Sequence, residues 1–146
     1  MNSDLYPIDA PTSVVSLLIQ CPTEGPRDGP PDMSALVSIQ DCPDETEDAD
    51  PASYIDEGEV PIWLLHGLAD SMVPYNQSQL LYDATVAAGN EARLTLVPGA
   101  DHSVPDIIDA ADATTWVTDR DGKEAETEGS GPSWDDLERF IRAGFE

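Results

Sequence analysis

Two polar residues, Asp70 and His102, each follow an apolar stretch of the sequence and could together carry out acid–base chemistry. Asp70 lies in HGLADSMVP (66–74), and His102 ends VPGADH (97–102). A hydroxyl group is a weak nucleophile at neutral pH, so a histidine beside it is needed as a general base. A carboxylate then fixes the tautomer of the imidazole and stabilises the imidazolium. The alternative interpretation is a solvated aspartate and an unrelated surface histidine.

The elements that carry these two residues are predicted to be buried strands of a parallel sheet. PIWLLHG (61–67) and RLTLV (93–97) are short, largely apolar runs of the kind found in parallel sheets. A helix between them completes a strand–helix–strand crossover, which places the two strands parallel. The carboxyl ends of such strands meet at one edge of the sheet, and neighbouring strands lie about 4.8 Å apart. We therefore expect a hydrogen bond between Asp70 and His102.

The connecting helix is predicted over residues 76–88. Asn76 is expected to be its N-cap, with Gln79 completing a capping box, and Gly89 is expected to end it. Its apolar stripe would comprise Leu80, Leu81, Ala84, Ala87 and Ala88.

The remaining elements are predicted from apolar periodicity and from the positions of proline and glycine. In chain order they are a buried strand (14–19), one or two helical turns (33–40), an acidic loop (41–52), a short helix (105–113), a hairpin (114–118 with 123–127) and a last helix that opens with a Ser133–Asp136 capping box.

Taken together, these motifs resemble the end of the α/β-hydrolases near the feruloyl and acetyl esterases and the prolyl-oligopeptidase-like catalytic domains. That family shows a strand, then H-G-x-x-D-x-x-V-P, a helix containing Q-S, a further strand, and P-G-A-x-H. The resemblance covers about residues 34–103. It implies that Asp70 is the acid and His102 the general base of a catalytic triad, whereas His66 ends its strand and has a structural role.

The resemblance also implies a serine nucleophile in a G-x-S-x-G turn, upstream of the acid and the histidine. These 146 residues contain neither that motif nor an oxyanion-hole H-G-G motif. Ser130, in EGSGP (128–132), is the nearest similar site, but it follows His102 and lacks the second glycine at the required spacing. The chain is therefore expected to be a fragment, a split gene product or a degenerate relic.

The expected fold class is α/β, as the C-terminal portion of an α/β-hydrolase fold with parallel strands, flanking helices and a small hairpin insertion. Residues 1–10 would form an extended segment and residues 11–146 a partial hydrolase domain. The hairpin insertion, residues 114–128, would either cover the substrate pocket or decorate the surface. Without an upstream half, the predicted strand 14–19 would have an open edge. We therefore expect self-association or a requirement for the missing half.

The charge of the chain limits its partners. Thirty acidic residues oppose six basic ones, for a net charge of −24, and Lys123 is the only lysine. Such a surface repels nucleic acid and anionic membranes, so neither is an expected partner. The resemblance to hydrolases implies a small-molecule ester or acyl compound as the substrate. No secretory signal is recognised in residues 1–10. The composition favours a halophilic protein, cytoplasmic or secreted in a high-salt organism, over an ordinary acidic protein.

No metal or cofactor is expected. Cys21 and Cys42 either form a disulfide across a 20-residue loop or remain two buried thiols, and neither has the spacing of a zinc ligand set. The acidic segment 41–50 lacks the glycine and terminal glutamate of an EF-hand loop, so it is interpreted as a solvated segment.

Two functions of different classes fit these observations. The first is serine-hydrolase-type hydrolysis of an ester, or of a peptide, to which this chain supplies the acid and the histidine but not the nucleophile. The second is a non-catalytic acidic module derived from a hydrolase, which would serve in binding or assembly.

The charge excess predicts that salt stabilises the folded chain. Self-repulsion among its carboxylates should be screened as salt rises from low to molar concentration, because the Debye length falls from about 10 Å at 0.1 M to about 3 Å at 1 M. We expect Tm, followed by circular dichroism, to rise over this range. An unchanged or falling Tm would contradict the halophilic interpretation.

Overall fold

The computed structural model describes residues 38–144, and the chain divides into two compact units, residues 1–54 and 55–146. The described part of the first unit consists of three short helices: η1 (Ile39–Asp41), α2 (Pro43–Ala49) and η2 (Pro51–Tyr54). The extended segment expected at residues 1–10 and the strand expected at 14–19 lie outside the described residues.

The prediction of an acidic loop over residues 41–52 is wrong, because α2 and the start of η2 occupy this segment. Pro43 stands in the first turn of α2, where a residue without an N–H costs nothing. Asp44 and Glu45 follow it, next to the positive end of the helix dipole. The prolines that were expected to stop regular structure instead begin two helices.

Cys42, which precedes α2, is buried and disulfide-bonded. Of the two alternatives for the cysteines, this favours the disulfide over free thiols. The second cysteine of the chain, Cys21, lies outside the described residues.

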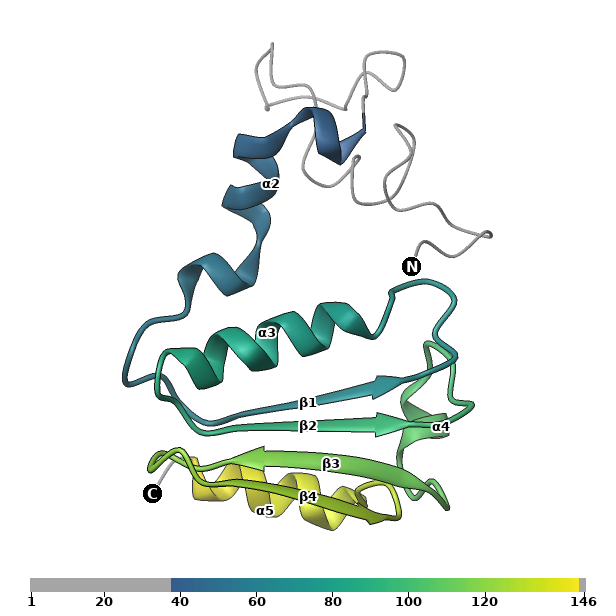
Figure 1. Cartoon of the computed structure of the whole chain (residues 1–146). Helices are drawn as coiled ribbons and strands as arrows, with labels where there is room; N and C mark the ends of the chain where they lie inside the picture. Colours follow the sequence, from purple (N-terminus) through teal and green to yellow (C-terminus); the bar gives the residue numbers. More distant parts are fainter. Residues whose placement is uncertain (1–37, 145–146) are drawn as a thin grey trace. The chain divides into compact units, whose positions relative to one another are not determined.

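The second unit is built on a sheet of four strands in the order β1-β2-β3-β4 (Figure 1). They are β1 (Ile62–Gly67), β2 (Ala92–Val97), β3 (Ala113–Thr118) and β4 (Glu124–Gly129). β1 and β2 are parallel, as the crossover between them predicts, and β2, β3 and β4 are successively antiparallel. The predicted hairpin is therefore present as β3 and β4, which extend the parallel pair on the β2 side.

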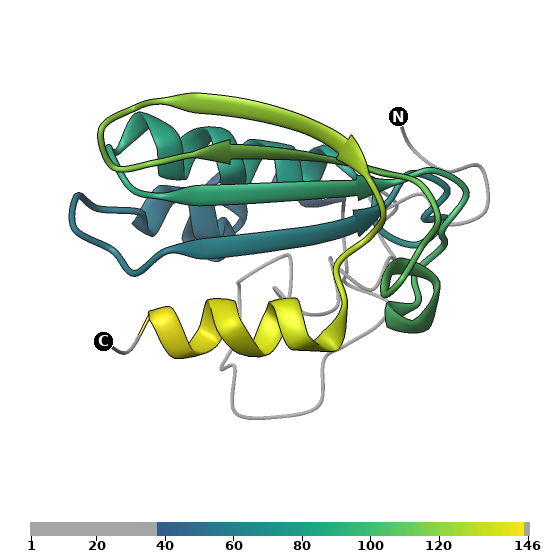
Figure 2. The same ribbon diagram turned by 90° about the horizontal axis from the view of Figure 1, so that it is seen from below.

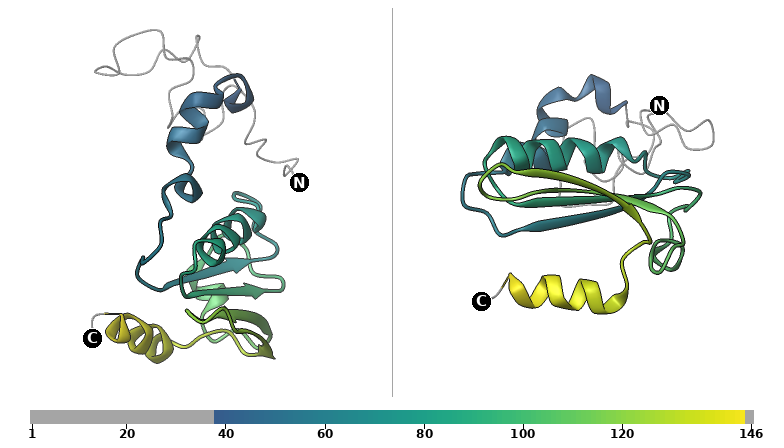
Figure 3. Two further views of the ribbon diagram at one scale, coloured as in Figure 1. Left: turned by 60° about the vertical axis from the view of Figure 1, so that its left-hand side comes forward. Right: turned by 60° about the horizontal axis from the view of Figure 1, so that its bottom comes forward.

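Helices lie on both faces of this sheet (Figures 2 and 3). α3 (Asn76–Ala87) covers one face and is tied to β3 by a 2.7 Å hydrogen bond between the hydroxyls of Tyr82 and Thr118. α5 (Trp134–Ala143) covers the opposite face, and the short α4 (Val104–Ile107) follows β2. None of the helices described between residues 38 and 144 is both long and apolar enough to cross a membrane.

The start of α3 differs from its prediction. Tyr75, not Asn76, is the N-cap, no side chain caps the helix, and the buried Oδ1 of Asn76 has no hydrogen-bond partner in the described structure. The predicted apolar stripe is also incomplete, because Leu80 is 57% exposed while Thr85 is wholly buried. Gly89 follows the helix with φ +79°, the left-handed conformation expected of a glycine in this place.

The helix predicted at residues 105–113 is shorter than expected. α4 ends at Ile107, Asp109 has φ +55°, and β3 already begins at Ala113. Ile107 and Ala113 instead pack with Val97 and Ala100 in an apolar cluster just beyond the end of β2. This cluster supports the loops at the carboxyl ends of β1 and β2.

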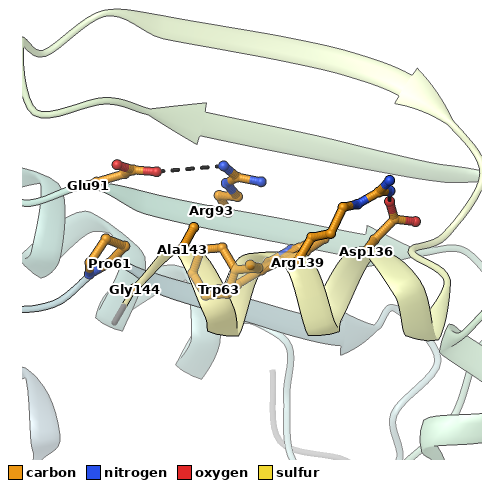
Figure 4. Close-up of a pocket in the computed structure, with 9 residues that line it drawn as sticks. Pro61, Trp63, Glu91, Arg93, Asp136, Arg139, Ala143 and Gly144 are labelled. Atoms are coloured by element: carbon orange, nitrogen blue, oxygen red, sulfur yellow. Dashed lines mark hydrogen bonds and ion pairs between the residues drawn. The ribbon is translucent and has the colours of Figure 1, made fainter. Parts of the chain in front are cut away.

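α5 begins as predicted, with a reciprocal capping box between Ser133 and Asp136. Under the helix, the rings of Trp63 and Phe140 meet edge to face with centroids 5.3 Å apart, and the Arg93 guanidinium lies over both rings. A pocket of about 400 Å³ remains between α5 and the sheet (Figure 4). Its sheet residues come from the amino ends of β1 and β2, so the pocket is separate from Asp70 and His102.

The capping box predicts a pH dependence of α5. Hydrogen bonds from the Ser133 hydroxyl and backbone, and from Arg139, lower the pKa of Asp136 to about 2. A carboxylate with a lowered pKa stabilises the fold above its unfolded pKa, about 3.9, and loses this effect as the pH falls toward the folded value. We expect wild type to be more stable than Asp136→Asn above about pH 4. Urea unfolding should show the difference shrinking to near zero as the pH approaches 2. A difference that is independent of pH would contradict this.

Candidate active site

Two loops run side by side beyond the carboxyl ends of β1 and β2, at the right-hand end of the sheet in Figure 1. We call residues 68–75 the acid loop and residues 98–103 the histidine loop. The Leu68 N–H donates to the carbonyl of Val97, and the Ala69 N–H donates to that of Ala100, both at 2.9 Å. These bonds continue the pairing of the strands and keep the loops in register.

Gly67 makes this close approach possible. A Cβ atom on Gly67 would lie 2.2 Å from the carbonyl oxygen of Ala100 and 2.9 Å from that of Asp101. Its φ lies outside the left-handed region, so the position requires glycine for space and not for conformation. The glycine of the H-G-x-x-D motif therefore has a steric explanation.

The structure brings Asp70 and His102 together, as expected from the strand order. Oδ2 of Asp70 lies 2.8 Å from Nδ1 of His102. The Asp70 side chain is 4% exposed, whereas that of His102 is 51% exposed. Among the described residues nothing bonds to Nε2 of His102, so this nitrogen is available to a further group.

The acid loop holds the Asp70 carboxylate from its other side. Oδ1 accepts hydrogen bonds from the backbone N–H groups of Met72 and Val73, each at 2.8 Å. Burial acts to raise the pKa of Asp70, but the hydrogen bonds from Val73, His102 and Met72 outweigh it, so the pKa lies below its ordinary value. Asp70 is therefore held as a carboxylate that accepts and does not donate.

His66 lies at the same carboxylate, although the sequence assigned it only a structural role. Its Nε2 is 2.9 Å from the carbonyl oxygen of Val73 and 3.2 Å from Oδ2 of Asp70. Its Nδ1 is 2.7 Å from the hydroxyl of Ser78, in the first turns of α3. His66 is 8% exposed, so it is buried between the sheet and α3.

Asp101 is a site residue that the sequence interpretation missed. Its Oδ1 accepts from the backbone N–H of Ser71 at 2.9 Å and from that of His102 at 2.8 Å. These two bonds lower the pKa of Asp101 below its ordinary value. The carboxylate thereby joins the histidine loop to the acid loop. The residue stands at the variable position of P-G-A-x-H, and no motif marked it.

Ser130, the serine nearest in sequence pattern to a nucleophile, is not bonded to His102. It is exposed, and no hydrogen bond joins it to His102 in the described part of the chain. Between residues 38 and 144 there is also no group of three His, Cys, Asp or Glu side chains arranged to hold a metal ion.

Comparison with known proteins places this arrangement in a family. The BD-FAE family model matches residues 13–85, and the secretory lipase model matches residues 54–129. The chain belongs to the α/β-hydrolases, among their esterases and lipases. The family resemblance and the partial α/β-hydrolase fold predicted from the sequence are thus confirmed, and ester hydrolysis is the reaction at the level of the family. The likeness to prolyl oligopeptidases stays a prediction.

One curated protein gives a further match to this hydrolase chain. It is the non-reducing polyketide synthase ausA of Penicillium brasilianum, 32% identical over 80 residues. The match covers 51% of this chain but only 3% of the synthase, so the chain spans a very small part of that protein. No solved structure gives a significant match.

The close approach at Gly67 predicts a large effect of a single methyl group. Gly67→Ala would force Cβ against backbone atoms of the histidine loop, and we expect it to lower the free energy of unfolding by about 3 kcal/mol. Gly129→Ala is the matched control, because a Cβ there meets nothing within 4 Å. The control should stay within about 0.5 kcal/mol of wild type in urea unfolding. Equal effects of the two changes would show that the loops do not need this contact.

Proposed function

We propose that this chain supplies the acid, Asp70, and the general base, His102, of an ester hydrolase whose serine nucleophile lies on a segment outside these residues. The observation that carries the proposal is the 2.8 Å contact between Oδ2 of Asp70 and Nδ1 of His102, with Nε2 left unbonded by the described residues. This is the polarity that a catalytic triad requires, with the carboxylate on one ring nitrogen and the nucleophile on the other.

In the proposed reaction Nε2 of His102 takes the proton of the serine hydroxyl while the oxygen attacks the carbonyl carbon of the ester. Asp70 keeps the Nδ1–H tautomer of the neutral ring and stabilises the imidazolium that forms. His102 then gives the proton to the leaving alcohol, and the acyl-enzyme is hydrolysed by the same steps with water in place of the serine. Backbone N–H groups outside this chain would hold the oxyanion, since the chain has no H-G-G motif.

The surroundings of the pair suit a partner segment and a neutral substrate. Exposed apolar side chains gather on the acid loop and at the start of α4; they are Leu68, Met72, Val73 and Val104. Such side chains next to an exposed imidazole fit contact with the nucleophile-bearing segment or with an acyl group. The net charge of −24 disfavours anionic esters.

The test joins the chain to an upstream hydrolase segment that carries G-x-S-x-G and measures hydrolysis of p-nitrophenyl acetate. Asp70→Asn should lower kcat about 10⁴-fold, because an amide can no longer fix the imidazole tautomer. His102→Ala should lower kcat by about 10⁴-fold or more, because the general base is lost.

Asp106→Asn is the control for this experiment. It removes a carboxylate in α4 that has no hydrogen bond from its side chain among the described residues, and it should leave kcat within about twofold of the parent value. Parent activity in Asp70→Asn and His102→Ala would refute the proposal. A folded joined protein without any esterase activity would favour the alternative, a non-catalytic acidic module, for which the absence of G-x-S-x-G from the chain is the supporting observation.

A further inference from the structure

We propose that His66 is a positioning residue for the acid–base pair: its Nε2–H holds the carbonyl of Val73, and with it the acid-loop backbone that orients the Asp70 carboxylate and keeps His102 in the Nδ1–H tautomer. The proposal rests on the proposed function, because it gives His66 a role through Asp70 and His102. It goes beyond the structural role that the sequence motif suggests for the residue.

The first argument is the number of donors around Asp70. Oδ1 accepts from two backbone N–H groups, of Met72 and Val73. Oδ2 faces Nδ1 of His102 at 2.8 Å and Nε2 of His66 at 3.2 Å. The two backbone groups and His102 are hydrogen-bonded to the carboxylate, whereas Nε2 of His66 is hydrogen-bonded to the carbonyl of Val73 and only lies near Oδ2. His66 therefore acts on the carboxylate through Val73, whose N–H is one of the two donors to Oδ1.

The second argument fixes the hydrogen on His66. Nε2 faces two acceptors, the carbonyl oxygen of Val73 at 2.9 Å and Oδ2 of Asp70. Neither oxygen can donate, so Nε2 must carry the hydrogen. Nδ1 faces the Ser78 hydroxyl at 2.7 Å, which can donate to it. The ring is thus held as the Nε2–H tautomer, with α3 on one side and the acid loop on the other.

The third argument is the position of the ring in the fold. His66 is the penultimate residue of β1, and its partner in β2 is Leu96, so its backbone is fixed by the sheet. Val73, whose carbonyl accepts a hydrogen bond from His66, also donates its backbone N–H to Asp70. The ring therefore ties the acid loop to the strand on both sides of the carboxylate. The charged or titratable groups nearest this carboxylate are His66, His102 and Asp101.

The test reads the tautomers of both histidines by ¹⁵N NMR of the full chain, at a pH where the imidazoles are neutral. In wild type we expect Nε2–H for His66 and Nδ1–H alone for His102. His66→Phe keeps a ring but removes the donor, so His102 should become a mixture of two tautomers. His66→Gln places an amide N–H near the position of Nε2 and should restore the single tautomer of His102.

Thr85→Val is the matched control. Thr85 is wholly buried, and its hydroxyl donates only to the carbonyl of Leu81 within α3. Its replacement can lower Tm but should not alter the tautomer of His102. A role for His66 as packing alone predicts that Phe preserves the His102 signal as well as Gln does.

Several outcomes would overturn the proposal. They are a His66 ring without hydrogen on Nε2, a folded His66→Phe protein in which His102 keeps one tautomer, or a His66→Gln protein that behaves like His66→Phe. If His66→Phe does not fold, the proposal is tested by the tautomer of His66 in wild type and by the tautomer of His102 in His66→Gln. A mixture of His102 tautomers already in wild type would refute the Asp70–His102 pair itself. Because no hydrolysis is measured, an inactive joined protein leaves the role of His66 standing.

Discussion

A buried carboxylate surrounded by donors is the interaction on which the site depends. Removing a charged group from water costs several kcal/mol unless its partners replace the lost hydration. Asp70 is 4% exposed in its side chain, yet donors face both of its oxygens, and the net effect is a lowered pKa. The donors come from the acid loop and the histidine loop, and His66 of β1 holds the acid loop through the carbonyl of Val73, so these parts must be in place together for the charge to be tolerated. The buried charge therefore favours this arrangement of the two loops, and the loops in turn position the carboxylate.

The two edges of the described sheet differ in a way that fits this partial fold. β4, at one edge of the sheet formed by the described strands, is exposed along its whole length and alternates glutamate with smaller residues. Such charges discourage a further strand from pairing there. β1, at the other edge, begins with Ile-Trp-Leu-Leu and is half-buried along most of its length. The edge next to the acid loop is thus the one suited to receive the rest of a hydrolase sheet, and the hairpin closes the opposite edge.

Much of the second unit could be predicted because its signals are local. The apolar runs before Gly67 and Pro98, separated by one helix length, determine a parallel pair, and that pair brings Asp70 to His102. The errors have physical causes too. Pro43 and Pro51 were interpreted as residues that end regular structure, although proline also begins helices. Asn76 was interpreted as an N-cap, but Tyr75 holds that position. The role of Asp101 could not be predicted, because its contact with Ser71 depends on which way side chains turn between loops 30 residues apart in sequence.

In the catalytic triad that we propose, the Asp70–His102 pair can form without the nucleophile, because its contacts are local to one unit of the fold. Every donor to Asp70 lies between His66 and His102, on one strand–helix–strand unit and its two loops. The closing contacts therefore join segments about 30 residues apart, and the entropy of closing such a loop grows only slowly with length. The proposed nucleophile, in contrast, would be brought to Nε2 of His102 by a part of the sheet that pairs outside this unit. Under this proposal, one contiguous segment pre-organises the acid and the base, whereas the position of the serine depends on how that segment packs against its neighbour at the exposed side of His102.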